Sequence, residues 1–336
     1  MGHATRCIPI INALLKHNFT PVIASDGDAL KLLQLEFKNL TFYQLPSYKI
    51  KYAKSGMFLP LKLFLQTPHF LKTALEEHRK IAEIVEKVNV EGIISDNRFG
   101  AFHTKIPSVY ITHQINIKAG LLSYFSTKIH YKIIKKYNEC WIPDVSTDDN
   151  FTGTLSNLNN NLIKTRYIGV LSRFKPKEVV KKYQLLVLLS GPEPQRTLLE
   201  QKLLKEIKIF EGKVLFVRGV LKAEKFKNTP TITFKNYLLS EALETAILQS
   251  EVVLARSGYT TIMDLAVLNS NAFFIPTPGQ TEQIYLAERL CKMKIAPFCK
   301  QQDFKINELK SIKHFKGLTA INAKLNKSMF KLFQGE

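Results

Sequence analysis

The sequence has few cysteines, and none of them lies in a pattern that binds a metal or builds a disulfide framework. The four cysteines are Cys7, Cys140, Cys291 and Cys299. They form no CxxC pair and no Cys/His pair with the spacing of a zinc site. We therefore expect reduced thiols, no structural metal and no disulfide.

Long apolar runs are also missing. No stretch reaches the 18 or more apolar residues that a membrane-spanning helix needs, and the first residues do not combine a charged region with an apolar signal core. This pattern predicts a cytoplasmic protein.

Acidic residues are scarce beside basic ones. The chain has 28 Asp and Glu against 48 Lys and Arg, which gives a formal net charge of +20. Such a charge attracts nucleic acid or an anionic membrane. The sequence has no RNP aromatic pattern, no zinc-finger spacing and no GXXG clamp, so no nucleic-acid partner is expected. A basic nucleic-acid-binding protein nevertheless stays an alternative interpretation, and a lysine-rich genome would produce the same charge.

Apolar strands alternate with helical segments along the whole chain of 336 residues. This alternation predicts parallel βαβ units, and the length suits two domains. We predict an α/β protein with an N-terminal Rossmann-like domain at 1–174, a linker at 175–183 and a second domain at 184–336. The two domains are expected to face each other across a cleft.

Polar residues follow two apolar strands of the first half. Asp96 ends the segment 90–95, and His113 follows the segment 108–112. In parallel sheets, ligands gather at the carboxyl ends of the strands. Asp96 and His113 are therefore candidate catalytic residues, although Asp96 could simply end its strand in a turn.

The run from Val252 to Ala287 carries the most specific pattern. A short apolar strand ends at Ala255, Arg256-Ser257-Gly258 interrupts it, and helical spacing follows from Tyr259. A turn that opens into a helix aims free backbone N–H groups at one point, where a diphosphate can bind. The apolar strand FFIP and a polar loop complete the unit.

This run resembles the two-domain (GT-B) glycosyltransferases of family 28, which include the enzyme that adds N-acetylglucosamine to lipid-linked peptidoglycan precursors. The resemblance is specific over about 35 residues and diffuse elsewhere. It implies a diphosphate on Ser257 and Gly258, a ribose on Asp264, and a sugar near Pro276 to Gly279, Glu282 and Gln283. Asp264 stands where Glu is commoner, and Leu286 stands where Asn is common.

The resemblance also places other residues at the donor. The loop at Gly191 and the following Arg196 would face the diphosphate, and Arg218 would line the pocket of the nucleotide base. The expected donor-binding residues are Gly191, Arg196, Arg218, Arg256, Ser257, Gly258, Asp264, Pro278, Gly279, Glu282 and Gln283.

For the catalytic base, the resemblance favours His3, with Asp96 and His113 as rivals. In the family an apolar strand and a Gly-rich loop precede a Gly-His pair, whereas this sequence starts at that pair, Gly2-His3. We therefore expect this chain to lack an N-terminal strand. Backbone N–H groups and a helix end can stabilise the leaving group, so we expect no metal and no cofactor.

Two segments, 52–70 and 120–137, mix aromatic residues with lysines. They could contact an anionic membrane surface or be amphipathic helices that face the core. The resulting interpretation is an inverting, metal-independent transfer from a nucleotide diphosphate sugar, expected to be a UDP-sugar, to a lipid-linked or membrane-proximal acceptor at the inner face of the membrane. The alternatives are a nucleotide-sugar 2-epimerase and a silent sugar-nucleotide sensor.

Overall fold

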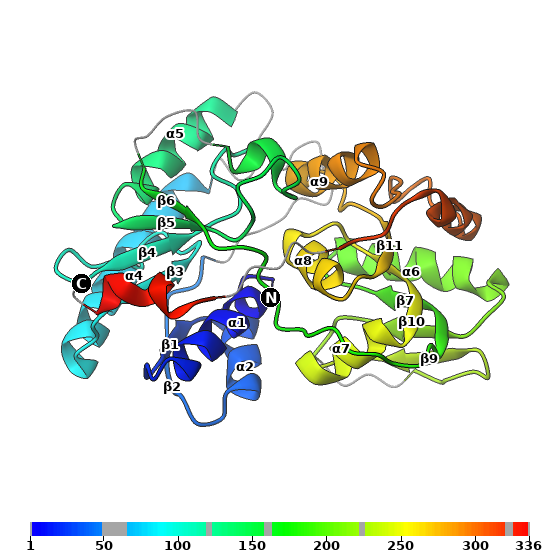
Figure 1. Cartoon of the computed structure of the whole chain (residues 1–336), viewed down its shortest axis with the longest axis horizontal. Helices are drawn as coiled ribbons and strands as arrows, with labels where there is room; N and C mark the ends of the chain where they lie inside the picture. Colours follow the sequence, from blue (N-terminus) through cyan, green and yellow to red (C-terminus); the bar gives the residue numbers. More distant parts are fainter. Residues whose placement is uncertain are drawn as a thin grey trace. The chain divides into compact units, whose positions relative to one another are not determined.

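A computed structural model describes residues 2–48, 66–118, 123–157, 163–221, 226–319 and 325–334 in two compact units (Figure 1). Among these residues, the first unit contains those up to 171 together with 325–334, and the second unit contains 172–221 and 226–319. All the strand pairs in both units are parallel. The predicted α/β class with two domains is confirmed.

The first unit contains two parallel sheets with helices between the strands. One sheet has the order β1-β2, and the other has the order β3-β4-β5-β6. The strands are β1 (Val22–Ser25), β2 (Thr41–Gln44), β3 (Ile93–Asp96), β4 (Ser108–Ile111), β5 (Glu139–Ile142) and β6 (Thr165–Tyr167). The helices are α1 (Gly2–Lys16), α2 (Gly27–Glu36), α4 (Thr67–Val88) and α5 (Ser123–Ile134), with 3-10 turns η3 (Gly153–Leu155) and η6 (Lys327–Phe333).

The C-terminal turn η6 belongs to the first unit. The Phe330 ring lies 5.6 Å from the ring of Phe19 and 6.1 Å from that of Trp141, measured between centroids, and both Phe330 and Trp141 are fully buried. Burying a side chain of this size stabilises a fold by roughly 1.5–3 kcal/mol. The sequence-based boundaries therefore need correction, because they assigned this end of the chain to the second domain. The second unit also begins at Ser172, inside the range 1–174.

The second unit has one continuous sheet in the order β11-β10-β7-β8-β9. Its strands are β7 (Tyr183–Leu188), β8 (Val214–Val217), β9 (Ile232–Lys235), β10 (Ser250–Ala255) and β11 (Asn271–Phe274). Its helices are α6 (Gln195–Glu206), α7 (Ser240–Leu248), α8 (Tyr259–Val267) and α9 (Thr281–Lys292), with 3-10 segments η4 (Ile207–Ile209) and η5 (Ile306–His314).

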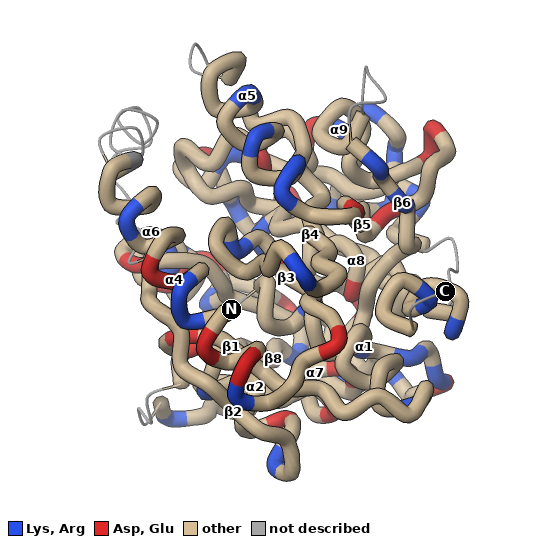
Figure 2. Tube along the Cα trace, turned by 90° about the vertical axis from the view of Figure 1, so that its left-hand side faces the viewer, with Lys and Arg blue, Asp and Glu red and all other residues tan. Residues whose placement is uncertain are grey.

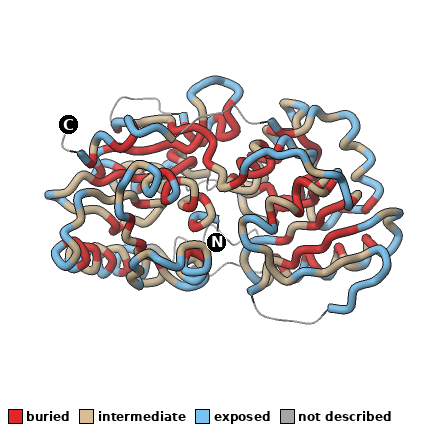
Figure 3. Tube along the Cα trace, turned by 60° about the horizontal axis from the view of Figure 1, so that its bottom comes forward, coloured by how far each residue is buried: buried red, intermediate tan, exposed pale blue. Residues whose placement is uncertain are grey.

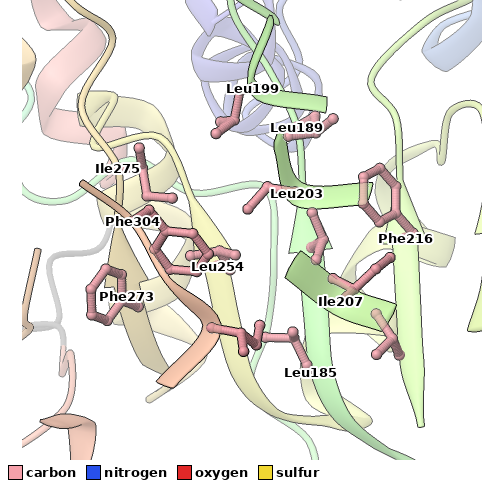
Figure 4. Close-up of a cluster of buried hydrophobic side chains, with 13 residues drawn as sticks. Leu185, Leu189, Leu199, Leu203, Ile207, Phe216, Leu254, Phe273, Ile275 and Phe304 are labelled. Carbon is pink, nitrogen blue, oxygen red and sulfur yellow. The ribbon is translucent and has the colours of Figure 1, made fainter. Parts of the chain in front are cut away.

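A dense apolar core fixes the second sheet. Figure 4 shows side chains of α6, such as Leu199 and Leu203, against Phe216, Leu254 and Phe273 of the strands. Each of these five side chains is at most 1% exposed. The inner strands β4, β5 and β8 are buried at every position, whereas the edge strands β2, β6 and β9 have no fully buried residue. Figure 3 shows buried stretches of chain inside each unit.

The structure corrects one element of the most specific sequence run. The residues after Gly279 were interpreted as a polar loop, but α9 begins at Thr281. Leu286 and Leu290, four residues apart, are fully buried and anchor this helix. Most of the aromatic and lysine-rich segment 52–70 lies outside the described residues.

Candidate functional site

In the first unit, the start of α1 meets the carboxyl ends of β3 and β4. His3, Arg6 and Cys7 lie three and four residues apart, so they share one face of the helix. Asp96 is the last residue of β3, and His113 follows β4 by two residues. The three residues predicted as catalytic therefore lie together, and Arg6, which was not predicted, joins them.

Arg6 is the centre of this cluster. It is 1% exposed, and it forms an ion pair with Asp96, with an Nε to Oδ2 distance of 2.9 Å. Burial alone would raise the pKa of the Asp96 carboxyl, but Arg6 and then His3 outweigh burial and hold that pKa well below its usual range. Asp96 is therefore a stable carboxylate at neutral pH and not a proton acceptor.

The hydrogen bonds constrain the two histidines. Arg6 donates from Nη1 to Nδ1 of His113 at 2.7 Å, and since a guanidinium has only donors, the His113 proton lies on Nε2. Nδ1 of His3 lies 3.0 Å from Oδ1 of Asp96 and 2.9 Å from Nη2 of Arg6. It can donate to Asp96 or accept from Arg6, but not both at once.

When His3 donates to Asp96, its Nε2 becomes the proton-accepting atom. The His3 side chain is 53% exposed, whereas the Asp96 side chain is 5% exposed. A half-exposed imidazole oriented by a buried carboxylate is the arrangement of a general base. His113 is 8% exposed and is held by Arg6, so it fits a positioning role better than that of the base.

In the second unit, the order of the strands reverses between β7 and β10. The chain runs from β7 outward to β8 and β9, and then returns to place β10 on the other side of β7. Ligands of open parallel sheets bind beside the carboxyl ends of the strands at such a reversal. Gly191 and Gly258 lie in the loops that leave these two strands, β7 and β10.

Both glycines leave open space beside the backbone. A Cβ atom placed on Gly258 would meet nothing nearer than Oγ1 of Thr261 at 3.9 Å, and one on Gly191 nothing nearer than Oγ1 of Thr277 at 3.9 Å. Gly191 has φ of +104°, which requires glycine, but Gly258 has an ordinary φ of −72°. The backbone conformation at 258 therefore does not require glycine. The small residue there leaves room for a ligand to approach the backbone closely.

Three helices begin at this edge of the sheet. α6, α8 and α9 start shortly after the carboxyl ends of β7, β10 and β11. The first N–H groups of a helix have no partner within the helix and carry partial positive charge. This edge therefore has the chemistry of an anion-binding site.

Arg256 braces the loops around this edge. Its guanidinium is 1% exposed and donates to the carbonyl oxygens of Ile275 at 3.0 Å, Pro276 at 3.1 Å and Gln195 at 2.9 Å. A further bond reaches Oε1 of Gln301 at 2.7 Å. Burial lowers the pKa of Arg256 to about 10. Arg256 thus holds the loops after β7 and β11 in place.

Arg196 and Arg218 share one carboxylate, which sequence reasoning missed. Nη1 of Arg196 lies 2.8 Å from Oε2 of Glu200, and Arg218 forms an ion pair with the same side chain. All three residues are at most 6% exposed. Arg218 also donates to Oδ1 of Asn236 at 3.0 Å and lies 4.0 Å from the ring centre of Phe226. The spacing of four residues between Arg196 and Glu200 was the available signal.

Asp264 lies on α8 and is 8% exposed. Its Oδ1 accepts a hydrogen bond from Oγ of Ser172 at 2.6 Å. Burial raises the pKa of Asp264 to about 6, although Arg173 and Ser172 oppose this shift. The carboxylate that was predicted to hold a ribose therefore already has a hydroxyl partner in this structure.

The loop after β11 is linked to α9 and to the turn after β10. Oγ of Ser257 donates to the carbonyl of Gln283 at 2.8 Å, and the amide N of Thr277 donates to Oε1 of Gln283 at 2.8 Å. Gln283 therefore orders the loop. Glu282 lies in the first turn of α9, while Pro278 and Gly279 form the half-buried turn before it, where Gly279 has φ of +80°.

Asp26 and Asp28 form an Asp-x-Asp pair that sequence reasoning missed. Asp26 pairs with Arg98, and Asp28 lies 3.6 Å from Nζ of Lys31. Across the described ranges, no group of three or more His, Cys, Asp or Glu side chains has a geometry that could hold a metal ion. None of the helices in the described part of the chain combines the length and apolar character needed to cross a membrane.

Comparison with known proteins agrees with this geometry. Residues 192–325 match the glycosyltransferase family 28 C-terminal domain. This matched range lies almost wholly within the second unit. The matched range contains the loops after β10 and β11 and most of the residues predicted to bind the donor.

One relative by sequence is the UDP-N-acetylglucosamine--N-acetylmuramyl-(pentapeptide) pyrophosphoryl-undecaprenol N-acetylglucosamine transferase of Haemophilus ducreyi. It is 23% identical over 212 residues, which cover 60% of this chain and 56% of the relative. The match thus spans little more than half the length of that relative.

Solved structures with the same fold cover almost the whole chain. The MurG structure from Acinetobacter baumannii has a TM-score of 0.55 at 12% identity and covers 99% of this chain and 89% of its own. The spinosyn rhamnosyltransferase SpnG complexed with thymidine diphosphate has a TM-score of 0.59 at 10% identity, with coverage of 100% and 89%. The chain therefore has the two-domain GT-B fold.

Proposed function

We propose that this protein transfers a sugar from a nucleotide diphosphate donor to an acceptor hydroxyl, with inversion and without a metal ion. The observation that carries the proposal is the strand-order reversal between β7 and β10, where Gly191 and Gly258 leave room for a ligand beside helix N-termini. The family 28 match over residues 192–325 supports the same assignment.

In this proposal the second unit holds the donor. Backbone N–H groups at the starts of α6 and α8 stabilise the diphosphate, and Asp264 exchanges Ser172 for the hydroxyls of the ribose. Arg196 and Arg218 contribute positive charge to the donor site, although Glu200 partly neutralises it. Uridine is proposed as the nucleotide because the Haemophilus ducreyi relative is named for a UDP-sugar.

The first unit supplies the base. Nε2 of His3 removes the proton from the acceptor hydroxyl, while Asp96 holds Nδ1 and stabilises the imidazolium that forms. The acceptor oxygen then bonds to the anomeric carbon of the sugar, and the bond from that carbon to the phosphate oxygen breaks. The nucleoside diphosphate leaves with the electron pair, from the face opposite to attack.

We further propose a lipid-linked or membrane-proximal acceptor and contact with an anionic membrane surface. Tyr124 and Phe125 at the start of α5 are 68% and 62% exposed. Lys128 lies one turn further along, with Nζ 5.9 Å from the ring centre of Tyr124, and Lys132 is a second basic residue of α5, whose basic positions are blue in Figure 2. Exposed rings beside lysines suit insertion at an anionic headgroup layer.

A thermal-shift panel of nucleoside diphosphates tests the donor site. UDP at about 100 times its Kd is expected to stabilise the second unit by about 2.7 kcal/mol, and the Asp264→Ala variant is expected to lose most of that shift. Equal shifts from all diphosphates would remove the uridine assignment, and no shift from any would contradict the donor site.

Two further measurements test the other parts. Turnover that persists in excess EDTA is expected, and turnover that requires added Mg²⁺ would refute metal independence.

Flotation with vesicles containing anionic lipid is expected to carry the protein, and the variant with Tyr124→Ser and Phe125→Ser is expected to stay behind. Equal flotation of both proteins would show that membrane binding does not depend on these two aromatic residues of α5.

A further inference from the structure

The segment 172–177 begins the second unit, directly after Leu171 of the first unit. The structure describes all of its residues, and none of them lies in a helix or a strand. Hydrogen bonds that involve side chains tie the segment to two helices of the second unit, α7 and α8. A segment held by few contacts opens locally at a low cost in free energy, so each of these bonds strongly influences its order.

The first residue of the segment binds Asp264, on α8. Oγ of Ser172 donates a hydrogen bond to Oδ1 of Asp264 at 2.6 Å, and the same Oγ accepts one from the amide of Phe174 at 3.1 Å. The Ser172 hydroxyl therefore holds the segment to α8 and also closes a turn within it. When Asp264 is no longer an acceptor, this turn loses its anchor on the helix.

The other contacts are with α7. Nη1 of Arg173 donates to Oγ of Ser240 at 3.1 Å, and the amide of Lys175 donates to Oε2 of Glu244 at 2.8 Å. Nζ of Lys177 lies 2.7 Å from Oε1 of Glu244. The Lys177 side chain is 45% exposed, so water and salt weaken this ion pair.

The bond from Ser172 to Asp264 is the shortest of these contacts, and its acceptor is the most buried. A hydroxyl donor and a carboxylate form a charge-assisted bond, which is roughly twice as strong as a bond between neutral groups. Asp264 is 8% exposed, so water competes little for its Oδ1. The order of the segment therefore depends chiefly on whether Asp264 remains available to Ser172.

We propose that the ribose of a bound nucleotide displaces Ser172 from Asp264, so that donor binding releases the segment 172–177. The inference rests on the proposed function, in which Asp264 holds the ribose. It adds that occupancy of the donor site controls the order of the segment that follows the first unit in the chain.

The two ribose hydroxyls are the reason that Ser172 must leave. The 2′ and 3′ hydroxyls are neighbours, so together they can donate to both oxygens of one carboxylate. Oδ2 of Asp264 has no hydrogen-bond partner among the described residues, whereas Oδ1 already binds Ser172. A ribose that uses both oxygens therefore needs the position of the Ser172 hydroxyl, and a ligand with one hydroxyl can use Oδ2 alone.

Linkage fixes the sign of the expected effect. If nucleotide binding weakens the attachment of the segment, then loss of that attachment must strengthen nucleotide binding by the same factor. Ser172→Ala is therefore expected to lower the Kd for UDP by about two- to tenfold. A serine that only supported the donor site would give the opposite sign.

Isothermal titration calorimetry with UDP at about pH 8 measures this change. Burial raises the pKa of Asp264 to about 6, so the carboxylate is ionised at that pH. Ser172→Thr keeps the hydroxyl and is expected to retain the Kd of the original protein. Lys177→Ala removes the exposed ion pair of the same segment and is expected to change the Kd less than about twofold.

A second nucleotide, 2′-deoxy-UDP, tests the role of the paired hydroxyls. It has one ribose hydroxyl and is expected to leave Ser172 on Oδ1 of Asp264. Ser172→Ala is then expected to change its Kd less than about twofold. Equal gains in affinity for UDP and 2′-deoxy-UDP would overturn displacement by the paired hydroxyls.

Hydrogen exchange followed by mass spectrometry reports the release itself. In the original protein, UDP is expected to speed exchange of the amides of Phe174 and Lys175 by at least about tenfold. The amides of β10 are expected to exchange no faster in the same samples. In Ser172→Ala, the segment is expected to exchange fast with and without UDP, while slow exchange in β7 and β10 reports that the second unit is folded.

Two results would overturn the inference and leave the donor site in place. One is a Kd for UDP that is equal or higher in Ser172→Ala, while Asp264→Ala still loses binding. The other is exchange in the segment 172–177 that UDP leaves unchanged or slows. Absence of UDP binding to the original protein would instead contradict the proposed donor site, and with it this inference.

Discussion

The two units place their buried charges in different ways. In the second unit, Arg256 is bonded to backbone carbonyls, and Glu200 is enclosed by two arginines, so the charges hold loops and helices together. In the first unit, Arg6 and Asp96 are equally buried, but they contact a half-exposed histidine. The comparison teaches that these buried charges brace loops and helices in the second unit, whereas in the first unit they also contact a half-exposed histidine, the proposed base.

The largest expected effect tests the chemical role of the first unit. His3→Gln is expected to lower kcat by about 100- to 10,000-fold, because no base would remain at Nε2. Its thermal stability is expected to stay close to that of the original protein, since the His3 side chain is 53% exposed. Release of nucleoside diphosphate in a coupled assay measures kcat. A similar loss in His113→Gln with none in His3→Gln would exchange the two roles.

The next effect tests the structural role of charge in the second unit. Glu200→Ala leaves Arg196 and Arg218 without their shared carboxylate, so the free energy of unfolding is expected to fall by about 3–5 kcal/mol. Urea unfolding measures it. Glu200→Gln keeps an oxygen acceptor and serves as the matched control, with a smaller loss. Identical losses for both substitutions would show that the charge of Glu200 is not what matters.

Asp264 gives a pH-dependent test. Its folded pKa of about 6 lies above the unfolded value of about 4. Between these values the folded protein binds more protons, so its stability falls as pH rises, by about 3 kcal/mol in total. Asp264→Asn is expected to remove this fall, as measured by urea unfolding at pH 4.5 and 7.5. It is also expected to weaken nucleotide binding, and a variant that kept the fall would contradict the assignment.

The smallest effect compares two threonines. Oγ1 of Thr277 is buried and has no hydrogen-bond partner among the described residues, whereas Oγ1 of Thr112, in the first unit, accepts from the amide of Gln114 at 3.1 Å. Thr277→Val is expected to be neutral or to stabilise the protein by up to about 1 kcal/mol. Thr112→Val is expected to destabilise it by a similar amount, and thermal unfolding measures both. Loss of stability in both variants would indicate a partner for Thr277.

The sequence was sufficient for most strands because buried parallel strands are short apolar runs. It failed at α9, where polar residues from Thr281 to Gln283 obscured the helical spacing of Leu286 and Leu290. It also failed at the C-terminal turn, since the contact of Phe330 with Trp141 joins positions far apart in the chain.

The residues of the candidate site that follow directly after strands could be predicted from the sequence. Asp96 and His113 end neighbouring strands, and the resemblance added His3. Arg6 was missed because its burial depends on contacts with both strand ends. The Ser172 partner of Asp264 lies 92 residues away in sequence, and no local pattern reveals such a contact.

Arg256 has a consequence for the thermodynamics of ligand recognition. One side chain links the start of α6 to the residues after β11 before any ligand arrives. A ligand at this edge would therefore immobilise little additional backbone, and the conformational entropy lost on binding would be small. Affinity would then depend mainly on the contacts formed, and it would change little when distant parts of the loops are shortened or stiffened.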